Sequence, residues 1–338
     1  MAHTLVLHVG LMKSGTTFLQ GRLDTNRALL AEQGIHFAGP TWARHAKGIA
    51  DFLELPQRRP GQWESLRDEI RAHEGVSVVS MEYLGPARPH RIARLVEEFP
   101  DTRLEVVISA RDLGRSVPAM WQETLKNRRT WTWEEYLAGI RRGGPAGKAF
   151  WNQQDLATIV GRWADGVGAD QVTVLTVPPS GAPPNLLWDR FREIAGIADA
   201  AWQEAPRANE SLGVASALLM RRLNLATEGL TRQRYKKRVK ALAKHTLVQR
   251  KGDEQPIGFT VPRWLRDRSN DARKTVETRG VRVVGDLAEL EPVDVRGVDP
   301  SAITPEDELE AAVFGLTQVL TRGNRAMRRP QQKHQRSL

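Results

Sequence analysis

The sequence contains no cysteine among its 338 residues. Disulfide bonds, thiolate metal ligands and cysteine nucleophiles are therefore excluded, while the compartment is only weakly constrained. The chain also lacks any apolar run that approaches the ~20 residues of a membrane-spanning helix. The first apolar run, from Leu5 to Leu11, is too short for a signal peptide and is interrupted by Lys13. From these absences we expect a cytoplasmic protein.

What is present is ordinary globular composition, with 40% hydrophobic and 27% charged residues. A chain of this length suffices for one large α/β domain or two small ones, and it buries roughly three quarters of its unfolded surface. We therefore expect a folded protein with a sizeable core.

Lys and Arg exceed Asp and Glu by 10, which is compatible with a nucleic acid, an anionic membrane surface or a polyanionic small ligand. The segment Arg322 to Arg336 carries six Lys and Arg and no acidic residue, so residues 323–338 are predicted to form a basic, disordered tail. This tail is a candidate for contact with the inner face of the membrane, and we expect no nucleic-acid partner. A second basic block, Arg232 to Arg250, has apolar residues at helical spacing. We interpret it as a solvated helix face, with contact to a ligand as the alternative.

Strand and helix patterns alternate along the first 200 residues. A buried strand is predicted at Leu5–Val9 and a helix at Thr16–Leu30. The runs Val76–Ser80 and Leu104–Ala110 enclose a helical pattern at Arg88–Phe99, which makes a β-α-β unit with parallel strands. The fold class is therefore α/β, a single doubly wound parallel sheet flanked by helices.

Further elements continue this pattern and then become mainly helical. We predict one α/β domain over residues 1–322 with helical C-terminal additions and no internal repeats. The remaining elements are predicted at Leu113–Lys126, a helix opened by the Thr132-x-x-Glu135 capping box, Leu156–Val167, the strand Val172–Val177, Leu212–Leu225, Arg232–Leu247, Trp264–Thr278, the strand Val281–Val284 and Pro305–Leu320.

A glycine-containing loop from Gly10 to Thr17 follows the first strand and opens the first helix. Backbone N–H groups and a helix N-terminus can bind a phosphate group at such a place. A nucleoside-triphosphatase loop requires G-x-x-x-x-G-K-[ST], but here Gly15 is followed by Thr16 where lysine should stand. The loop is therefore predicted to bind phosphate in a different way, and a helix cap without a ligand is the alternative.

The loop closely resembles the 5′-phosphosulfate loop of sulfotransferases that use 3′-phosphoadenosine 5′-phosphosulfate (PAPS). The matching residues are Lys13, Ser14, Gly15, Thr16 and Thr17. The resemblance implies a P-loop NTPase-like sulfotransferase fold, with these five residues binding the donor and PAP as the product. Within the family, the sequence is most similar to the actinobacterial-type branch.

A second segment, Ile108-Ser109-Ala110-Arg111-Asp112, resembles the 3′-phosphate segment of the same family. Arg111 would bind that phosphate, because a guanidinium can make two charge-assisted hydrogen bonds to one phosphate. An ion pair at the strand end is the alternative role for Arg111. Many family members carry a serine eight residues later, where this chain has Ala119, and Arg115 and Ser116 are the candidate replacements.

Weaker matches extend over much of residues 3 to 290. Arg250-Lys251-Gly252 is similar to a 3′-phosphate loop of cytosolic family members, although we do not assign it that role. The other matching segments are Gly34-Ile35-His36-Phe37, His45, Arg207-Ala208-Asn209-Glu210-Ser211-Leu212 and Val283-Val284-Gly285-Asp286-Leu287.

The activity that the resemblance implies is in-line transfer of the sulfuryl group to a hydroxyl or amine. Lys13 would neutralise the leaving phosphate, so no metal is expected. Glu82, just after the Val76–Ser80 strand, is the candidate general base because the family keeps its base near this position. His8, His45 and His90 are its rivals. His8 is expected to be a core histidine, and His45 to contact the acceptor substrate.

The acceptor is not defined by any motif, and carbohydrate, lipid and secondary-metabolite acceptors all stay open, as does the oligomeric state. A P-loop kinase or other nucleotide-dependent phosphotransferase is the alternative enzyme. A basic protein that binds nucleic acid or a membrane surface is the alternative from another class.

Overall fold

The computed structural model describes residues 3–205 and 211–327, and the chain forms two compact units. Unit 1 comprises Met1–Met120, Tyr136–Asn209 and Thr260–Asp294, and unit 2 comprises Trp121–Glu135, Glu210–Phe259 and Val295–Leu338. Two of the boundaries between the units fall within helices, α6 (Leu113–Lys126) and α7 (Trp133–Arg142). The prediction of one domain over residues 1–322 stays a prediction.

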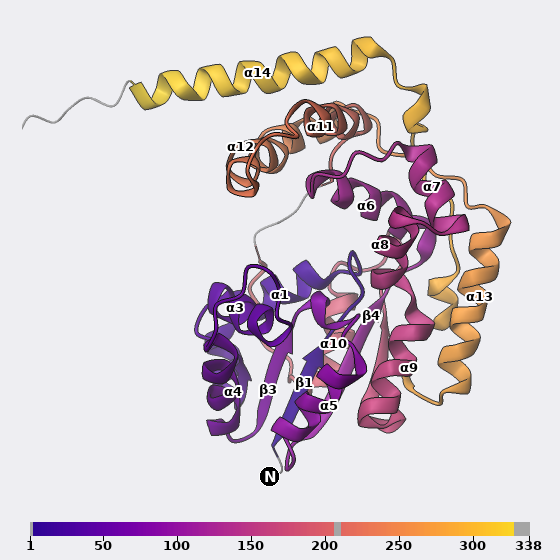
Figure 1. Cartoon of the computed structure of the whole chain (residues 1–338). Coiled ribbons are helices and arrows are strands. Elements are labelled where there is room, and N and C mark those ends of the chain that lie inside the picture. Colours follow the sequence, from indigo (N-terminus) through magenta and orange to yellow (C-terminus); the bar gives the residue numbers. More distant parts are fainter. Residues whose placement is uncertain (1–2, 206–210, 328–338) are drawn as a thin grey trace, which may run out of the picture. The chain divides into compact units, whose positions relative to one another are not determined.

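Unit 1 is built on one six-stranded sheet in the order β2-β3-β1-β4-β5-β6, and every pairing is parallel. Figure 1 shows β1 between β3 and β4. In register, His8 at the end of β1 lies beside Ser80 of β3 and Val107 of β4. The predicted fold class, a single parallel sheet flanked by helices, is confirmed. The strands are β1 (Thr4–His8), β2 (Ile35–Phe37), β3 (Val76–Ser80), β4 (Arg103–Ala110), β5 (Val172–Thr176) and β6 (Arg282–Val284).

Helices cover both faces of the sheet, because alternate strand residues point to opposite sides. Leu5 and Leu7 of β1 pack into the core of one face, and Val6 packs into the core of the other. The first face is covered by α3 (Trp42–Phe52), α4 (Gln62–Ala72), α5 (Pro89–Glu98), α9 (Leu156–Val167) and α13 (Arg263–Thr278). The second is covered by α1 (Thr16–Thr25), α2 (Arg27–Glu32) and α10 (Leu186–Ala195).

Further helices and turns follow these strands. Asp112 caps α6 (Leu113–Lys126), since its carboxylate accepts a hydrogen bond from the Arg115 backbone N–H. The predicted capping box is confirmed, because Thr132 and Glu135 exchange hydrogen bonds at the start of α7 (Trp133–Arg142). The remaining elements of this part are α8 (Pro145–Gln154) and the 3-10 turns η1 (Glu82–Leu84), η2 (Ala169–Gln171) and η4 (Leu287–Leu290).

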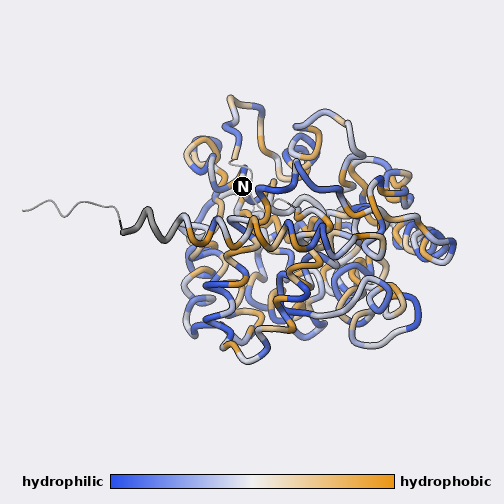
Figure 2. Tube along the Cα trace, turned by 90° about the horizontal axis from the view of Figure 1, so that it is seen from above, coloured by the Kyte–Doolittle hydropathy of each residue, from blue (hydrophilic) through white to orange (hydrophobic). Residues whose placement is uncertain are grey.

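Unit 2 is mainly helical. A buried polar contact joins its helices, because the Tyr235 hydroxyl donates to the Asn224 side chain over 2.7 Å. Hydrophobic segments recur along the last helix, which precedes the grey end of the trace (Figure 2). Its elements are α11 (Val214–Ala226), α12 (Arg232–His245), η3 (Leu247–Gly252), η5 (Pro300–Ala302) and α14 (Pro305–Met327).

Some of the expected elements differ from those of the structure. The helix expected over Thr16–Leu30 is interrupted at Asn26, whose side chain exchanges two hydrogen bonds with the backbone of Gln203. A side chain bonded in this way competes with helix continuation. A short strand, β2, was also not expected.

The last helix extends beyond its predicted end at Leu320. Its backbone continues to Met327, so residues 323–327 of the expected tail are helical, and residues 328–338 lie outside the described residues. The family-like segment 207–210 also lies outside them. Among the residues that the structure describes, no helix is both long and apolar enough to cross a membrane.

Candidate active site

The loop between β1 and α1 has an unusual backbone. Lys13 has φ of 65° and Gly15 has φ of 80°. Two of three consecutive residues therefore lie in the left-handed region. A lysine rarely adopts such a conformation, which costs free energy and is concentrated at functional sites. Left-handed residues within a turn point successive backbone N–H groups into a concave surface that binds anions. The loop therefore has the backbone form of an anion site.

The start of α1 supports the same interpretation. Gly15 is the N-cap residue, no side chain caps the helix, and its first turn contains no acidic residue. The first N–H groups of a helix lack partners within the helix and carry a partial positive charge. The φ of Gly15 favours glycine, and a Cβ atom there would displace the Leu187 side chain, which would lie 2.4 Å away. Thr16 and Thr17 form the first helical turn at this point.

Neighbouring strands and α8 hold the loop in place. The backbone N–H groups of Val9 and Leu11 donate to the carbonyls of Val107 and Ser109 on β4. The Gln154 side chain donates to the Met12 carbonyl over 2.6 Å. This support explains how the structure maintains a strained conformation at Lys13.

A buried chain of hydrogen bonds runs beneath the loop. The Ser14 hydroxyl donates to the Leu11 carbonyl, so it accepts from Ser109 at 2.7 Å. Nε2–H of His8 then donates to Ser109 over 3.0 Å, and Nδ1 accepts from Ser80 over 2.7 Å. Burial lowers the pKa of His8 to about 3, in agreement with a neutral ring. The expectation of a core histidine is confirmed, and the Ser14 hydroxyl is engaged within the protein.

Arg111 follows the last residue of β4 and lies next to the loop. It donates to the Lys13 carbonyl over a long 3.4 Å, and its buried Nε has no hydrogen-bond partner among the described residues. Burial, and then the charge of Arg115, lower its pKa to about 10, so the side chain is still cationic at neutral pH. A buried N–H of a guanidinium that has no hydrogen-bond acceptor is costly unless an anion binds it. Arg111 thus fits the predicted phosphate contact.

The side chains of Arg115 and Ser116 differ in whether they have partners within the protein. The Arg115 guanidinium pairs with Asp112 and donates to the Pro178 carbonyl over 3.1 Å, so it is engaged within the protein. The Ser116 hydroxyl is buried and has no hydrogen-bond partner among the described residues. Roles in donor binding stay predictions for both residues, and the geometry favours Ser116.

Glu82 lies in the turn after β3, on the side of the loop opposite to Arg111 in the strand order. Its carboxylate accepts a hydrogen bond of 2.9 Å from Gln20, which is one turn along α1 from Thr16. The turn also packs closely on the loop, because a Cβ atom on Gly85 would lie 3.0 Å from the carbonyl oxygens of Val9 and Gly10. The structure therefore brings the candidate base and the candidate phosphate loop together.

His45 has a position that differs from its expected role. It is fully buried in α3, where Nδ1–H donates to the Ala38 carbonyl over 2.7 Å and Nε2 accepts from the Ser80 backbone N–H over 3.2 Å. Burial lowers its pKa to about 4. Acceptor contact by His45 stays a prediction, although both ring nitrogens are already bound to backbone. His90 is exposed near the start of α5.

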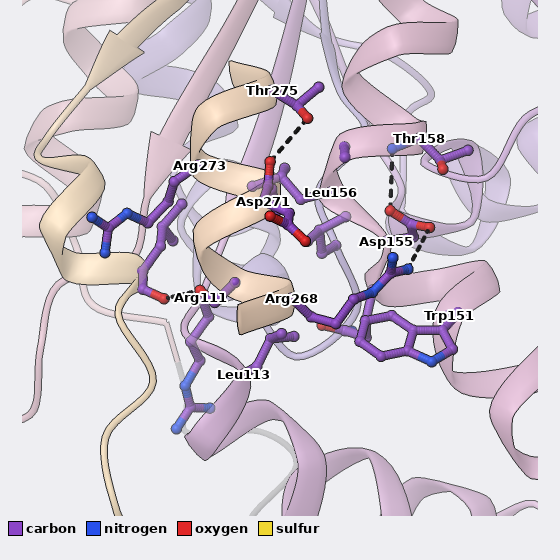
Figure 3. Close-up of a pocket in the computed structure, with 16 residues that line it drawn as sticks. Arg111, Leu113, Trp151, Asp155, Leu156, Thr158, Arg268, Asp271, Arg273 and Thr275 are labelled. Atoms are coloured by element: carbon purple, nitrogen blue, oxygen red, sulfur yellow. Dashed lines mark hydrogen bonds and ion pairs between the residues drawn. The ribbon is translucent and has the colours of Figure 1, made fainter. Parts of the chain in front are cut away.

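A cavity of about 220 Å³ adjoins the loop in unit 1. Leu11 and Arg111 border it. Arg268 also lies in its wall, where it pairs with Asp155 and lies over the Trp151 ring. In Figure 3 the Arg111 side chain points away from Arg268. Lys13 and Glu82 are not part of its wall. The cavity is therefore a neighbour of the loop rather than the place where these two residues meet.

These contacts together define a candidate active site at the carboxyl ends of β3, β1 and β4. Open parallel sheets bind ligands at this edge. It combines a loop with the backbone form of an anion site, a lysine in that loop, a partly buried arginine and a carboxylate. Sequence analysis missed Gln20, Gln154 and the Ser80–His8–Ser109 chain. Polar residues at the ends of buried strands were the only signal for that chain.

Comparisons with known proteins add little. No protein-family model matches the chain, and no curated protein matches it. Among solved structures, the chain is similar to the crystal structure of a sulfotransferase from Alicyclobacillus acidocaldarius, with 18% identity over 70% of this chain and 100% of that one. The TM-score is 0.42. A likeness of this size carries no argument about function, which we base on the site itself.

Proposed function

We propose that this protein is a sulfotransferase that transfers the sulfuryl group of PAPS to a hydroxyl or amine of an acceptor. The observation that carries the proposal is the left-handed loop at Lys13 and Gly15, with Arg111 and Glu82 after the two adjacent strands. This arrangement provides an anion site, a second cation and a proton acceptor at one edge of the sheet.

The donor is bound by two groups of residues in this proposal. The backbone of the loop, the first turn of α1 and the Lys13 ammonium bind the 5′-phosphosulfate. Arg111 binds the 3′-phosphate, which would provide the acceptor that its buried Nε lacks among the described residues. Thr16 stands where a triphosphatase loop has its lysine, and this difference favours PAPS over a nucleoside triphosphate.

When bound, the donor supplies an activated sulfuryl group, whose bond to the 5′-phosphate oxygen breaks as a bond to the acceptor oxygen or nitrogen forms. Lys13 stabilises the negative charge that develops on the phosphate, so no metal ion is required. Glu82 takes the proton from the acceptor, and Gln20 holds its carboxylate beside α1. The acceptor is a small molecule, glycan or lipid that carries a hydroxyl or amine.

Isothermal titration of the full chain with PAP and with ATP plus Mg²⁺ tests this function. We expect PAP to bind at least about tenfold more tightly, because only PAP carries a 3′-phosphate for Arg111. Tighter binding of ATP with Mg²⁺ would contradict the proposal and favour a kinase or another phosphotransferase.

A further inference from the structure

Unit 2 carries almost all of the net positive charge of the chain. It contains 21 Lys and Arg against 12 Asp and Glu, whereas unit 1 contains 29 against 28. The largest concentration is in residues 229–252, which hold nine Lys and Arg and no acidic residue. The charge that suggested a polyanionic ligand therefore belongs mainly to the unit without the phosphate loop.

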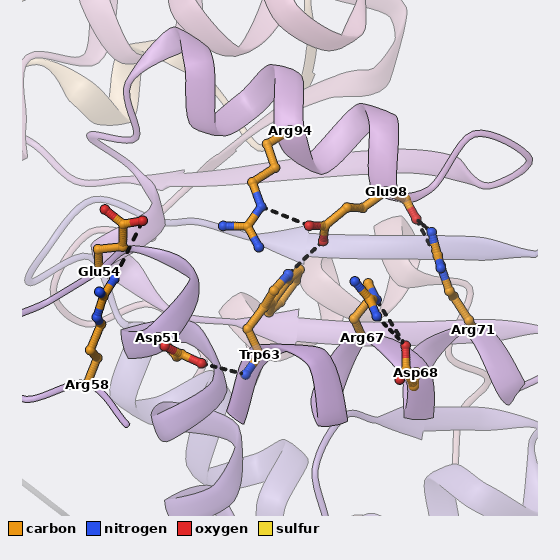
Figure 4. Close-up of polar contacts among 9 residues, drawn as sticks. All are labelled: Asp51, Glu54, Arg58, Trp63, Arg67, Asp68, Arg71, Arg94 and Glu98. Carbon is orange, nitrogen blue, oxygen red and sulfur yellow. Dashed lines mark hydrogen bonds and ion pairs between the residues drawn. The ribbon is translucent and has the colours of Figure 1, made fainter. Parts of the chain in front are cut away.

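Most cations of α12 are exposed. Six of them have no ion pair with a carboxylate among the described residues: Arg232, Arg234, Lys236, Lys237, Arg238 and Lys244. By contrast, arginines of unit 1 bond to acidic residues, as Arg94 does to the Glu98 carboxylate and Arg58 to Glu54 in Figure 4. What distinguishes α12 is therefore the concentration of such cations on one helix.

These cations also act against the helix that carries them. Like charges four residues apart destabilise an α-helix, and α12 has four such pairs. The pairs are Arg232 with Lys236, Arg234 with Arg238, Lys236 with Lys240, and Lys240 with Lys244. An anionic surface next to the helix would remove this repulsion. The charge is therefore better explained by an anionic partner than by solvation.

The second feature is an exposed apolar stripe on α14. Its side chains are between 55% and 63% exposed and recur every three or four residues, so most share one face: Leu309, Val313, Leu316, Val319 and Leu320. The opposite face is the packed one, where Ala311 is buried and a Cβ atom on Gly315 would lie 3.5 Å from Leu247. The stripe is thus directed away from the core of unit 2.

We propose that unit 2 docks on an anionic lipid bilayer through α12 and the apolar stripe of α14. The two helices both pack on α11, so the cations and the stripe belong to neighbouring elements of one unit. Lipid headgroups complement the cations, and the interfacial acyl region accepts leucine and valine side chains.

Other partners account for only part of these features. A nucleic acid would complement the cations but has no apolar surface for the stripe. A second copy would cover the stripe, but it would bring two strongly basic units together. Two of the four carboxylates at the start of α14 already face cations of unit 2, because Glu308 pairs with Arg222 and Glu310 lies 3.9 Å from Arg250.

Sedimentation of the full chain with lipid vesicles tests the proposal. We expect binding to phosphatidylcholine vesicles that contain 30% phosphatidylglycerol, little binding to pure phosphatidylcholine, and weaker binding as salt is added. The triple variant Lys236→Gln, Lys237→Gln, Arg238→Gln should bind about 100-fold more weakly, at about fivefold for each cation. Leu316→Ser with Leu320→Ser should reduce binding at least about tenfold.

A matched control is available on unit 1. Arg141→Gln, Arg142→Gln, Lys148→Gln removes three exposed cations there and should leave vesicle binding within about twofold of wild type. Circular dichroism and thermal melting of every variant separate lost binding from lost folding. Equal loss in both triple variants would overturn the proposal, because it would indicate a response to net charge alone.

Two further measurements can also overturn it. Binding to duplex DNA that exceeds vesicle binding and does not depend on Leu316 and Leu320 would assign the surface to a polyanion. A dimer in light scattering that Leu316→Ser with Leu320→Ser dissociates, without vesicle binding by either form, would assign the stripe to a second copy.

Discussion

Unit 1 and unit 2 use positive charge in opposite ways. Unit 1 is nearly neutral, yet it places single cations at the loop and after β4, where Lys13 adopts a left-handed backbone and Arg111 keeps an unpaired buried Nε. Unit 2 is strongly basic, yet α12 displays its cations on an exposed face. Net charge thus indicates a surface that attracts anions, whereas backbone conformation and burial indicate a site that positions a ligand.

The largest expected effect is in unit 1 and follows loss of the candidate base. Glu82→Gln keeps the shape of the side chain but cannot take a proton, so turnover should fall by about 100-fold or more while PAP affinity barely changes. Turnover is measured as PAP released from PAPS in the presence of a panel of hydroxyl and amine acceptors.

The control for Glu82 is His45→Asn in the same assay, because His45 is the rival base. We expect this variant to keep most of its turnover after correction for its folded fraction. The reverse pattern, with active Glu82→Gln and inactive His45→Asn, would transfer the role of base to His45.

Lys13→Ala should lower turnover by about 100-fold, with a smaller effect on PAP affinity, since its charge acts mainly on the transition state. Lys148→Ala removes an exposed cation from the same unit and is the matched control. If both variants had the turnover of wild type, the difference between positioned and surface charge would disappear.

Arg111→Gln should weaken PAP by roughly 30-fold, the loss of about 2 kcal/mol from charge-assisted hydrogen bonds. Adenosine 5′-phosphosulfate lacks the 3′-phosphate, so its affinity should change much less. Titration calorimetry with both ligands measures the difference, and equal weakening of both would indicate structural damage instead.

Acid should destabilise unit 1 through its buried histidines. In the folded protein the pKa of His8 is about 3 and that of His45 is about 4. In the unfolded chain both histidines become protonated below a pH of about 6.5, where the folded protein still keeps them neutral. Stability is therefore lost as pH falls, by about 1.4 kcal/mol per pH unit for each histidine.

Urea unfolding of wild type and His45→Gln between pH 6 and 5 isolates one of these contributions. The variant should lose about 1.4 kcal/mol less per pH unit than wild type. Identical slopes would show that His45 becomes protonated in the folded protein.

The smallest effect is expected from the end of unit 2. Deleting residues 328–338 removes a single large apolar side chain, Leu338, so the melting temperature should change by no more than about 2 °C and PAP affinity should not change. A tenfold loss of PAP affinity would mean that the basic end of the chain contributes to the donor site.

Much of the fold could be predicted because local patterns determine it. The bounds of β3, α6 and α9 match those expected, since each is a continuous apolar or amphipathic run between clear caps and turns. β2 has only three residues, too few for periodicity to indicate a strand. The interruption of the first helix depends on hydrogen bonds between Asn26 and Gln203, which are far apart in the sequence.

The candidate site could likewise be predicted only in part from the sequence. Lys13, Glu82 and Arg111 could be named because each follows a predicted strand, and the carboxyl ends of parallel strands share one edge of the sheet. The hydrogen bond from Gln20 to Glu82 could not be predicted, because it depends on two side chains that are far apart in the sequence and meet only in the folded protein. Their catalytic and binding roles stay predictions.

Hydrogen–deuterium exchange of the full chain with and without PAP tests the central claim most directly. PAP should protect backbone amides in residues 10–17 and 111–116, and it should leave residues 232–245 of α12 unchanged. Protection of α12 without protection of the loop would contradict the account, since the phosphate groups would then bind to surface charge rather than to the positioned site of unit 1.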